Sequence, residues 1–256
     1  MQSANQTFSS DGVEIAYYDE GAGPPIVLIH GFASSALANW YEPLWVKTLT
    51  EAGYRVISFD HRGHGRSAKL YQSELYRAPL MAKDAANLII HLDLPPVPVL
   101  GYSMGARVTA LLAIQAGHLV HTAMLAGLAE NMINGVGGEP EIAAGLRAPS
   151  LDHVTDPQAR AFRIFAERTG GDLEALASCI MASRQKISPE ELGTISCPVL
   201  VAAGTEDTVA GAIEPLVDAL GDAEALPIPR RDHMRAVGDK VFKAGVLRFL
   251  EKHGSR

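Results

Sequence analysis

The chain has 256 residues, of which 47% are hydrophobic, and this length and composition suit one large domain or one domain that carries an insertion. Its formal net charge of -7 argues against nucleic acid or an anionic membrane surface as a partner, because both require a clustered basic face. No apolar run approaches the ~20 residues that span a bilayer, and the polar N-terminus lacks the pattern of an export signal, so we expect a cytoplasmic protein.

Short apolar runs alternate with longer amphipathic segments, a pattern typical of an α/β fold. The first element differs, because the alternation and turn residues of FSSDGVEIAYYDEG predict an antiparallel hairpin. The later strands are almost continuously apolar, which indicates burial on both faces and hence a parallel sheet. They are predicted at PPIVLIHGF, YRVISFDHRGHG, VPVLGYSMG, HTAMLAGL, CPVLVAAGTED and AEALPIPRRDH. Helices are predicted at residues 38–52, 79–93, 104–117, 212–220 and 238–252.

Residues 129–190 interrupt this alternation. They contain no convincing strand, but DPQARAFRIFAERTG and DLEALASCIMASRQ are strongly helical, and each begins with an aspartate that can cap a helix. In an open parallel sheet such an insertion emerges near the carboxyl ends of the strands, where ligands bind. We therefore predict a core of residues 1–128 and 191–256 and a helical cap, or lid, of residues 129–190. The alternative is that these helices only thicken the core.

The segment GYSMG places Ser103 between two glycines, directly after a predicted strand and directly before a predicted helix. This is the setting that a nucleophile elbow requires. So sharp a turn strains the serine backbone and leaves no room for side chains two residues away on either side, hence Gly101 and Gly105. The hydroxyl would stand near the N-terminal end of the following helix, which favours developing negative charge. We predict a nucleophile; the alternative is a serine that only forms a turn.

A serine hydroxyl needs a base to take its proton and an acid to orient that base. Of the nine histidines, His233 follows the last predicted strand and also follows the serine, in the chain order that the elbow arrangement expects. His30, His61 and His64 follow earlier strands, but they lie in tight glycine turns where we expect the rings to brace loops. The other five lie in or beside helices or in the insertion. We therefore predict that His233 is the base.

The acid is expected after the strand CPVLVAAG, where Glu206 and Asp207 are both available, and Asp232 beside the base is a rival. Together, the segments HGF, DHRGHGRS, GYSMG, GTED and DHM resemble those of the α/β-hydrolase-fold serine hydrolases over nearly the whole chain. In similar proteins the acid lies three residues after the strand-ending glycine, which favours Asp207. The chain departs from the family pattern at Tyr102, where histidine is common, and at Arg231 and Asp232, where glycine often precedes the base.

The resemblance implies a mostly parallel sheet flanked by helices and a catalytic triad of Ser103, His233 and Asp207 that needs no metal or organic cofactor. The fold supplies oxyanion donors from the backbone N–H groups of Met104 and, we expect, Phe32. Substrate contacts are expected from Tyr102, Phe162 and Phe165.

A serine nucleophile disfavours epoxide hydrolases and haloalkane dehalogenases, which resemble this chain but use aspartate at this position. The leading prediction is an esterase, monomeric or homodimeric, that cleaves carboxylic esters of small or medium acyl chains. Lactone hydrolysis and hydrolytic carbon–carbon cleavage use the same triad, and perhydrolase or haloperoxidase-like turnover is a candidate side activity. The alternative outside enzymes is a small-molecule receptor of the same fold that signals through a moving lid.

The predicted cap should close one apolar face over the serine and make a compact pocket. That face is expected from small and large apolar residues, namely Ala143, Ala144, Ala175, Ala177, Phe162, Ile164, Phe165, Leu173 and Leu176. The charged residues of the same region are interpreted as a solvated face rather than a clamp for a carboxylate: Arg147, Arg160, Arg163 and Arg168.

Overall fold

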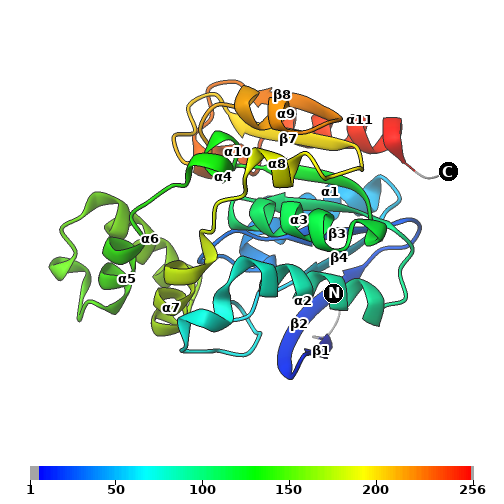
Figure 1. Cartoon of the computed structure of the whole chain (residues 1–256). Helices are drawn as coiled ribbons and strands as arrows, with labels where there is room; N and C mark the ends of the chain where they lie inside the picture. Colours follow the sequence, from blue (N-terminus) through cyan, green and yellow to red (C-terminus); the bar gives the residue numbers. More distant parts are fainter. Residues whose placement is uncertain (1–5, 255–256) are drawn as a thin grey trace.

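A computed structural model describes residues 6–254, which form an eight-stranded sheet with helices on both faces (Figure 1). The strand order is β1-β2-β4-β3-β5-β6-β7-β8. The first two strands form the antiparallel hairpin, β2 pairs antiparallel with β4, and every later pair is parallel. The strands are β1 (Gln6–Ser10), β2 (Val13–Glu20), β3 (Pro25–Ile29), β4 (Arg55–Phe59), β5 (Val97–Tyr102), β6 (Val120–Ala126), β7 (Val199–Gly204) and β8 (Ala223–Ile228). The predicted α/β-hydrolase sheet is confirmed.

Alternate residues of the central strands face two different cores. In β3, Val27 and Ile29 pack into the core under α2 (Ala78–His91) and α3 (Met104–Gln115), whereas Ile26 and Leu28 pack against the opposite helices. Because both faces of these central strands are buried, their sequences are apolar at most positions rather than at every second one. The remaining helical elements of the core are η1 (Leu37–Tyr41), α1 (Trp45–Glu51), η2 (Ser73–Tyr76), η3 (Gly117–Leu119), α9 (Glu214–Ala219), α10 (His233–Ala236) and α11 (Lys240–His253).

The helix predicted at residues 38–52 is in fact two. A π-helical turn, η1, ends at Tyr41, and α1 begins at Trp45 after Leu44, which adopts a left-handed backbone with φ of 63°. Pro43 lies at the break, and its missing N–H cannot continue a helical hydrogen-bond ladder. The prediction of one continuous helix is therefore wrong, although both pieces pack on the sheet.

Between β6 and β7 the described chain contains only helices, as predicted: α4 (Glu130–Asn134), α5 (Glu139–Arg147), η4 (Leu151–His153), α6 (Pro157–Arg168), α7 (Leu173–Ser183) and α8 (Pro189–Leu192). Of these, α5, α6 and α7 pack on one another and form a lobe beside the sheet, which we call the helical lobe (Figure 1). Asp156 and Asp172 cap α6 and α7 as expected, accepting the N–H groups of Ala159 and Ala175.

The interpretation of a solvated arginine face is wrong for Arg163. Its side chain is buried, and its guanidinium donates to the carbonyls of Gly145, Leu146 and Ala148 at 2.9 to 3.0 Å. The last carbonyls of a helix have no partner within that helix, so this cation caps the C-terminal end of α5. The other three arginines of the set are exposed or partly exposed: Arg147, Arg160 and Arg168.

Candidate active site

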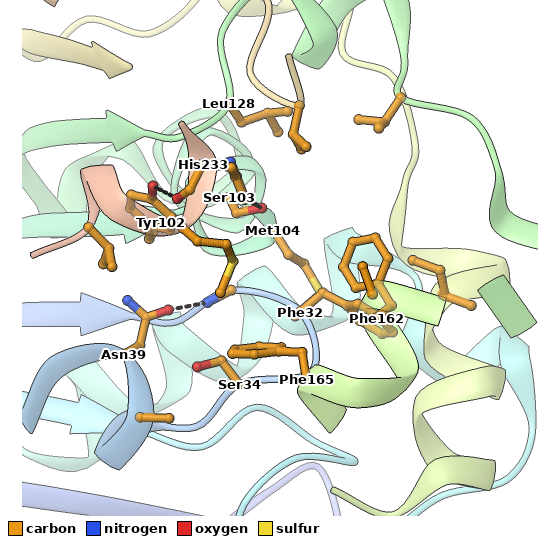
Figure 2. A pocket seen from close by; sticks show the side chains of 18 of the residues that line it. Phe32, Ser34, Asn39, Tyr102, Ser103, Met104, Leu128, Phe162, Phe165 and His233 are labelled. Atoms are coloured by element: carbon orange, nitrogen blue, oxygen red, sulfur yellow. Dashed lines mark hydrogen bonds between the residues drawn. The ribbon is translucent and has the colours of Figure 1, made fainter. Parts of the chain in front are cut away.

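Three side chains from three strand ends meet at the carboxyl edge of the sheet. Ser103 follows β5, Asp207 follows β7, and His233 begins α10 after β8. Ser103 Oγ lies 3.1 Å from Nε2 of His233, and Nδ1 of His233 lies 2.8 Å from Oδ2 of Asp207. The first of these contacts is visible in Figure 2. The structure thus brings together the three residues that the sequence predicts as nucleophile, base and acid.

The turn at Ser103 has the geometry of an elbow. Its backbone is left-handed, with φ of 57° and ψ of -115°, a conformation that is strained for any residue with a side chain. A Cβ on Gly101 would lie 2.1 Å from the carbonyl oxygen of Gly105, and one on Gly105 would lie 2.0 Å from that of Ile29. Both glycines are therefore required for the helix to start this close to the sheet.

Asp207 is held ready to orient the imidazole. Its side chain is fully buried, and Oδ1 accepts the N–H groups of Val209 at 3.0 Å and Ala210 at 2.9 Å. The rival Asp232 caps α10 by accepting the N–H groups of Met234 and Arg235. Glu206, the other alternative, is exposed to solvent. The carboxylate that faces His233 is thus that of Asp207.

Tyr102 fixes the backbone that carries the base. Its hydroxyl donates to the carbonyl of His233 at 2.5 Å, and burial raises the pKa of Tyr102 well above its usual value, so the phenol stays a donor. The same loop lies against the end of β7, where a Cβ on Gly204 would approach the carbonyl oxygen of Arg231 to 2.0 Å. Tyr102 also lines the cavity at the serine, as expected, but its polar end is used within the protein.

The two predicted oxyanion donors, Phe32 and Met104, line the same cavity as the serine. Three neighbouring N–H groups in the loop after β3 are bound to side chains: Gly31 to Asn39 at 3.0 Å, Ala33 to His64 at 3.2 Å and Ala36 to Asp60 at 2.7 Å. Among residues 6–254, the N–H of Phe32 donates to no acceptor, and neither does that of Met104 at the start of α3. A rigid loop with free N–H groups is suited to stabilise a developing oxyanion.

Three of the histidines that precede the serine brace this loop. His30 accepts the N–H of His61 at 3.0 Å, and the three rings of His30, His61 and His64 stack edge to face in the interior. Burial lowers the pKa of His30 to about 4 and that of His64 to about 3. The rings are therefore neutral at physiological pH, and their role is structural.

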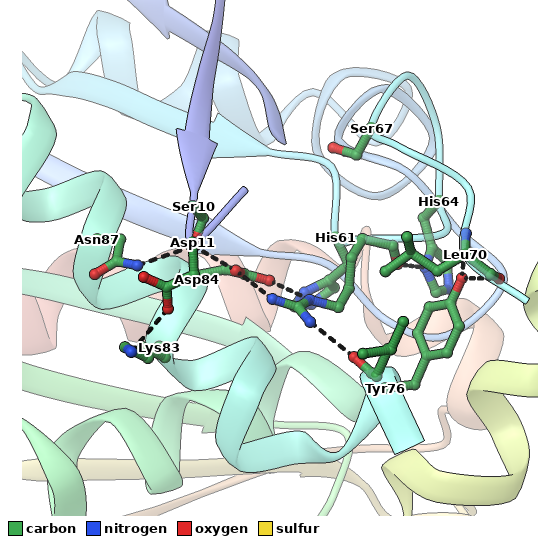
Figure 3. A network of polar contacts seen from close by, with 12 residues as sticks. Ser10, Asp11, His61, His64, Ser67, Leu70, Tyr76, Lys83, Asp84 and Asn87 are labelled. Atoms are coloured by element: carbon green, nitrogen blue, oxygen red, sulfur yellow. Dashed lines mark hydrogen bonds and ion pairs between the residues drawn. The ribbon is translucent and has the colours of Figure 1, made fainter. Parts of the chain in front are cut away.

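A buried ion pair supports the turn that holds these rings (Figure 3). Arg62 donates to Asp84 through Nε at 2.7 Å and Nη2 at 2.8 Å, and Ser10 donates to the same carboxylate at 2.6 Å. The hydroxyl of Tyr76 holds the end of the same loop by donating to the carbonyl of Leu70 at 2.6 Å. The motif DHRGHGRS thus shapes the loops around the site and supplies no group to it.

A cavity of about 730 Å³ opens onto Ser103 between the sheet edge and the helical lobe. Its wall is mostly apolar, and the rings of Phe162 and Phe32 pack edge to face with their centres 5.5 Å apart (Figure 2). Phe162, Ile164 and Phe165 line it as expected. Other members of the expected face do not line it: Ala143, Ala175, Ala177 and Leu176 are buried inside the lobe, Leu173 is partly buried, and Ala144 is exposed.

Sequence reasoning missed two cationic residues in the cavity wall, Arg107 and Arg184. A signal existed for the first, since it is the one charged residue of α3, a helix whose residues 104–113 are all buried. A charged side chain is seldom fully buried without a partner or a function. The sequence around Arg184 carries no such signal, because this residue lies at the end of α7 and reaches the cavity wall only through the packing of that helix.

Comparisons with known proteins agree with this geometry. A family model described as the alpha/beta hydrolase fold matches residues 24–165, which is more than half of the chain. The chain belongs to this family. The non-heme chloroperoxidase of Kitasatospora aureofaciens is 30% identical, over 94% of this chain and 98% of its own.

Solved structures of other α/β hydrolases superpose closely. A hydrolase from Pseudomonas aeruginosa has a TM-score of 0.80 at 25% identity, with 99% of each chain covered. An esterase from Exiguobacterium antarcticum has a TM-score of 0.76 at 23% identity, covering 94% of this chain and 97% of the other, and this likeness shows the fold alone. In the part of the chain that the structure describes, no helix is long and apolar enough to cross a membrane.

Proposed function

We propose that this α/β hydrolase is a serine esterase that cleaves carboxylic esters through an acyl-enzyme. The observation that carries the proposal is the continuous chain of contacts from Ser103 through His233 to Asp207, at the base of an apolar cavity. His233 accepts the Oγ proton while Oγ bonds to the acyl carbon, and Asp207 holds the tautomer with the proton on Nδ1 and stabilises the imidazolium.

The N–H groups of Phe32 and Met104 would then donate to the oxyanion of the tetrahedral intermediate. Loss of one such donor typically raises the barrier by about 3 kcal/mol. As the bond to the alcohol breaks, His233 returns the proton to the leaving oxygen. Water attacks the acyl-enzyme with His233 again as base, which releases the carboxylic acid and restores Ser103.

The shape of the cavity supports a preference for small or medium acyl chains. Phe32, Phe162 and Phe165 form an apolar wall beside the serine, and each methylene buried against such a wall contributes about 0.8 kcal/mol to binding. The cavity of about 730 Å³ is finite, however, so a longer chain must leave it. We propose that the helical lobe acts as the lid of this cavity.

The test is multiple turnover of p-nitrophenyl esters from acetate to palmitate, measured as kcat/KM. An optimum at short or medium chains supports the esterase, whereas an optimum at palmitate with a jump above the solubility limit would show a lipase. No turnover of any ester, together with tight binding of a small molecule, would favour a receptor. Lactones and vinylogous diketones in the same assay separate lactone and carbon–carbon hydrolysis from ester hydrolysis.

A second candidate activity is favoured by the similarity to the non-heme chloroperoxidase. Hydrogen peroxide in place of water would attack the same acyl-enzyme, form a peroxycarboxylic acid and release Ser103, with the proton passing through His233. Peracid formation from an ester and peroxide should then disappear in the same variants as ester hydrolysis.

A further inference from the structure

Arg107 is a cation in the cavity wall, and two of its three guanidinium nitrogens lack a hydrogen-bonding partner in the described part of the chain. It is 2% exposed, and its Nε and Nη2 have no hydrogen-bond acceptor among residues 6–254. Burial, and next the nearby charge of Arg184, lower the pKa of Arg107 to about 10, so the side chain remains cationic at neutral pH. A buried charge without a partner is strongly unfavourable, and such groups are retained where something binds to them.

Arg184 places a second guanidinium at the same wall. It donates to the carbonyl of Gly137, lies 5.7 Å from the ring centre of Phe162 and is 3.9 Å from Glu139. Ser183 beside it also lines the cavity, and its side chain interacts with the buried thiol of Cys179. This end of an otherwise apolar cavity is thus polar, and Nε and Nη2 of Arg107 are its unused donors.

The charges at this wall do not cancel. Two guanidinium groups face one carboxylate, that of Glu139, which leaves a single positive charge. The other charged residues of the cavity, Glu42 and Arg168, are exposed and of opposite sign. One excess positive charge matches a monoanion rather than a phosphate dianion.

The same protein shows how the unused edge of Arg107 is normally satisfied. Arg62 holds Asp84, and Arg55 holds Asp19, in both cases through Nε and Nη2 on the two carboxylate oxygens at 2.7 to 2.9 Å. These two nitrogens form the planar fork that fits a carboxylate. In Arg107 the same two nitrogens, Nε and Nη2, are buried and have no acceptor among residues 6–254. To bind a carboxylate there, the guanidinium must therefore rotate toward the cavity.

We propose that Arg107 and Arg184 form a subsite for a carboxylate group of the substrate, which makes the preferred substrates esters that carry a free carboxylate. This inference rests on the proposed esterase function, because it names the substrate class of the same site. Arg107 lies in the first turn of α3, about one helical turn after Ser103 at the N-cap, so one small molecule can place its carboxylate at Arg107 and its ester carbonyl at Ser103.

The experiment compares monoethyl esters of linear dicarboxylic acids with ethyl esters of equal length that end in methyl, at pH 7.5. We expect a higher kcat/KM for the carboxylate series at one chain length, and Arg107→Met should lower the ratio of carboxylate to neutral ester by about tenfold to a hundredfold. Arg107→Lys should restore part of that ratio. Arg147→Met removes the same charge from the Glu174 pair outside the cavity and should leave the ratio unchanged.

A second series of esters, with the free carboxylate on the alcohol part instead of the acyl part, is measured in the same way. The series with the higher kcat/KM shows whether the subsite binds the acid or the alcohol part of the substrate. If Arg107→Met does not fold, the proposal is tested by the ratio of kcat/KM for carboxylate and neutral esters in the wild type and in Arg184→Gln, which should lower that ratio. If no ester turns over, the two proposals are separated by calorimetry of monoethyl adipate with Ser103→Ala, with and without Arg107→Met. Binding that is lost with Arg107→Met supports the subsite and rejects the esterase. Equal kcat/KM for both series at every length, or tighter binding of a phosphonate dianion, would overturn the carboxylate subsite.

Discussion

At the scale of single residues, the site depends on a few atoms held by unrelated parts of the chain. His233 is fixed at three points, through Nε2 to Ser103, through Nδ1 to Asp207 and through its carbonyl to Tyr102. Oδ1 of Asp207 also accepts two backbone N–H groups, those of Val209 and Ala210. The imidazole is thereby oriented before any substrate arrives.

Replacement of the orienting acid should separate it from its two rivals. Asp207→Asn should lower kcat for a short p-nitrophenyl ester by about 10⁴-fold, because the amide no longer holds the required tautomer. Asp232→Asn and Glu206→Gln are the matched controls, since neither carboxylate contacts His233. A larger loss in Asp232→Asn than in Asp207→Asn would transfer the role.

Removal of the Tyr102 hydroxyl tests how the base is positioned. Tyr102→Phe leaves the partly buried carbonyl of His233 without this donor, and loss of such a hydrogen bond typically costs about 1 kcal/mol. We expect a lower midpoint of urea unfolding and a fall in kcat with little change in KM, since the ring and its contacts remain. An unchanged kcat in a folded variant would show that the hydroxyl does not position the base.

At the scale of elements, the sequence predicted most reliably what depends on local pattern. The central strands were recognisable because both faces of each are buried, and the caps Asp156 and Asp172 because a cap acts within three residues of itself. The triad followed from strand ends and chain order. What could not be predicted depends on packing between distant segments, such as Arg163 on the end of α5 and the interior alanines of the helical lobe.

The buried histidine loops predict how stability depends on pH. Because the folded pKa values of His30 and His64 lie below the ordinary 6.5, their contribution is complete above pH 6.5 and is lost as pH falls toward 4 and 3. Between pH 6.5 and 5, the free energy of unfolding should fall by about 1.4 kcal/mol per pH unit for each ring.

Urea denaturation at several pH values measures this slope. His64→Asn should reduce the slope by about one proton, whereas His153→Asn, which changes an exposed ring, should leave it as in the wild type. A wild-type stability that is constant from pH 6.5 to 5 would contradict the assignment of neutral buried rings.

At the scale of the whole molecule, the sheet provides a rigid edge and the helical lobe closes the space beside it. Thr169 at the end of α6 donates to the carbonyl of Ala33 at 2.7 Å, so the lobe is tied to the loop that carries the Phe32 N–H. The cavity between them combines the nucleophile, the two free N–H groups and an apolar wall. Ester hydrolysis needs each of these at once, and they come from segments far apart in the chain.

The central claim, that Ser103 is the nucleophile of an ester hydrolase, is tested most directly by kcat/KM of purified Ser103→Ala toward a short p-nitrophenyl ester. The account predicts a variant that unfolds at the same urea concentration as the wild type and retains less than about a hundredth of its activity, the residual rate coming from binding and the oxyanion donors alone. A folded variant with more than about a hundredth of wild-type kcat/KM would contradict the claim.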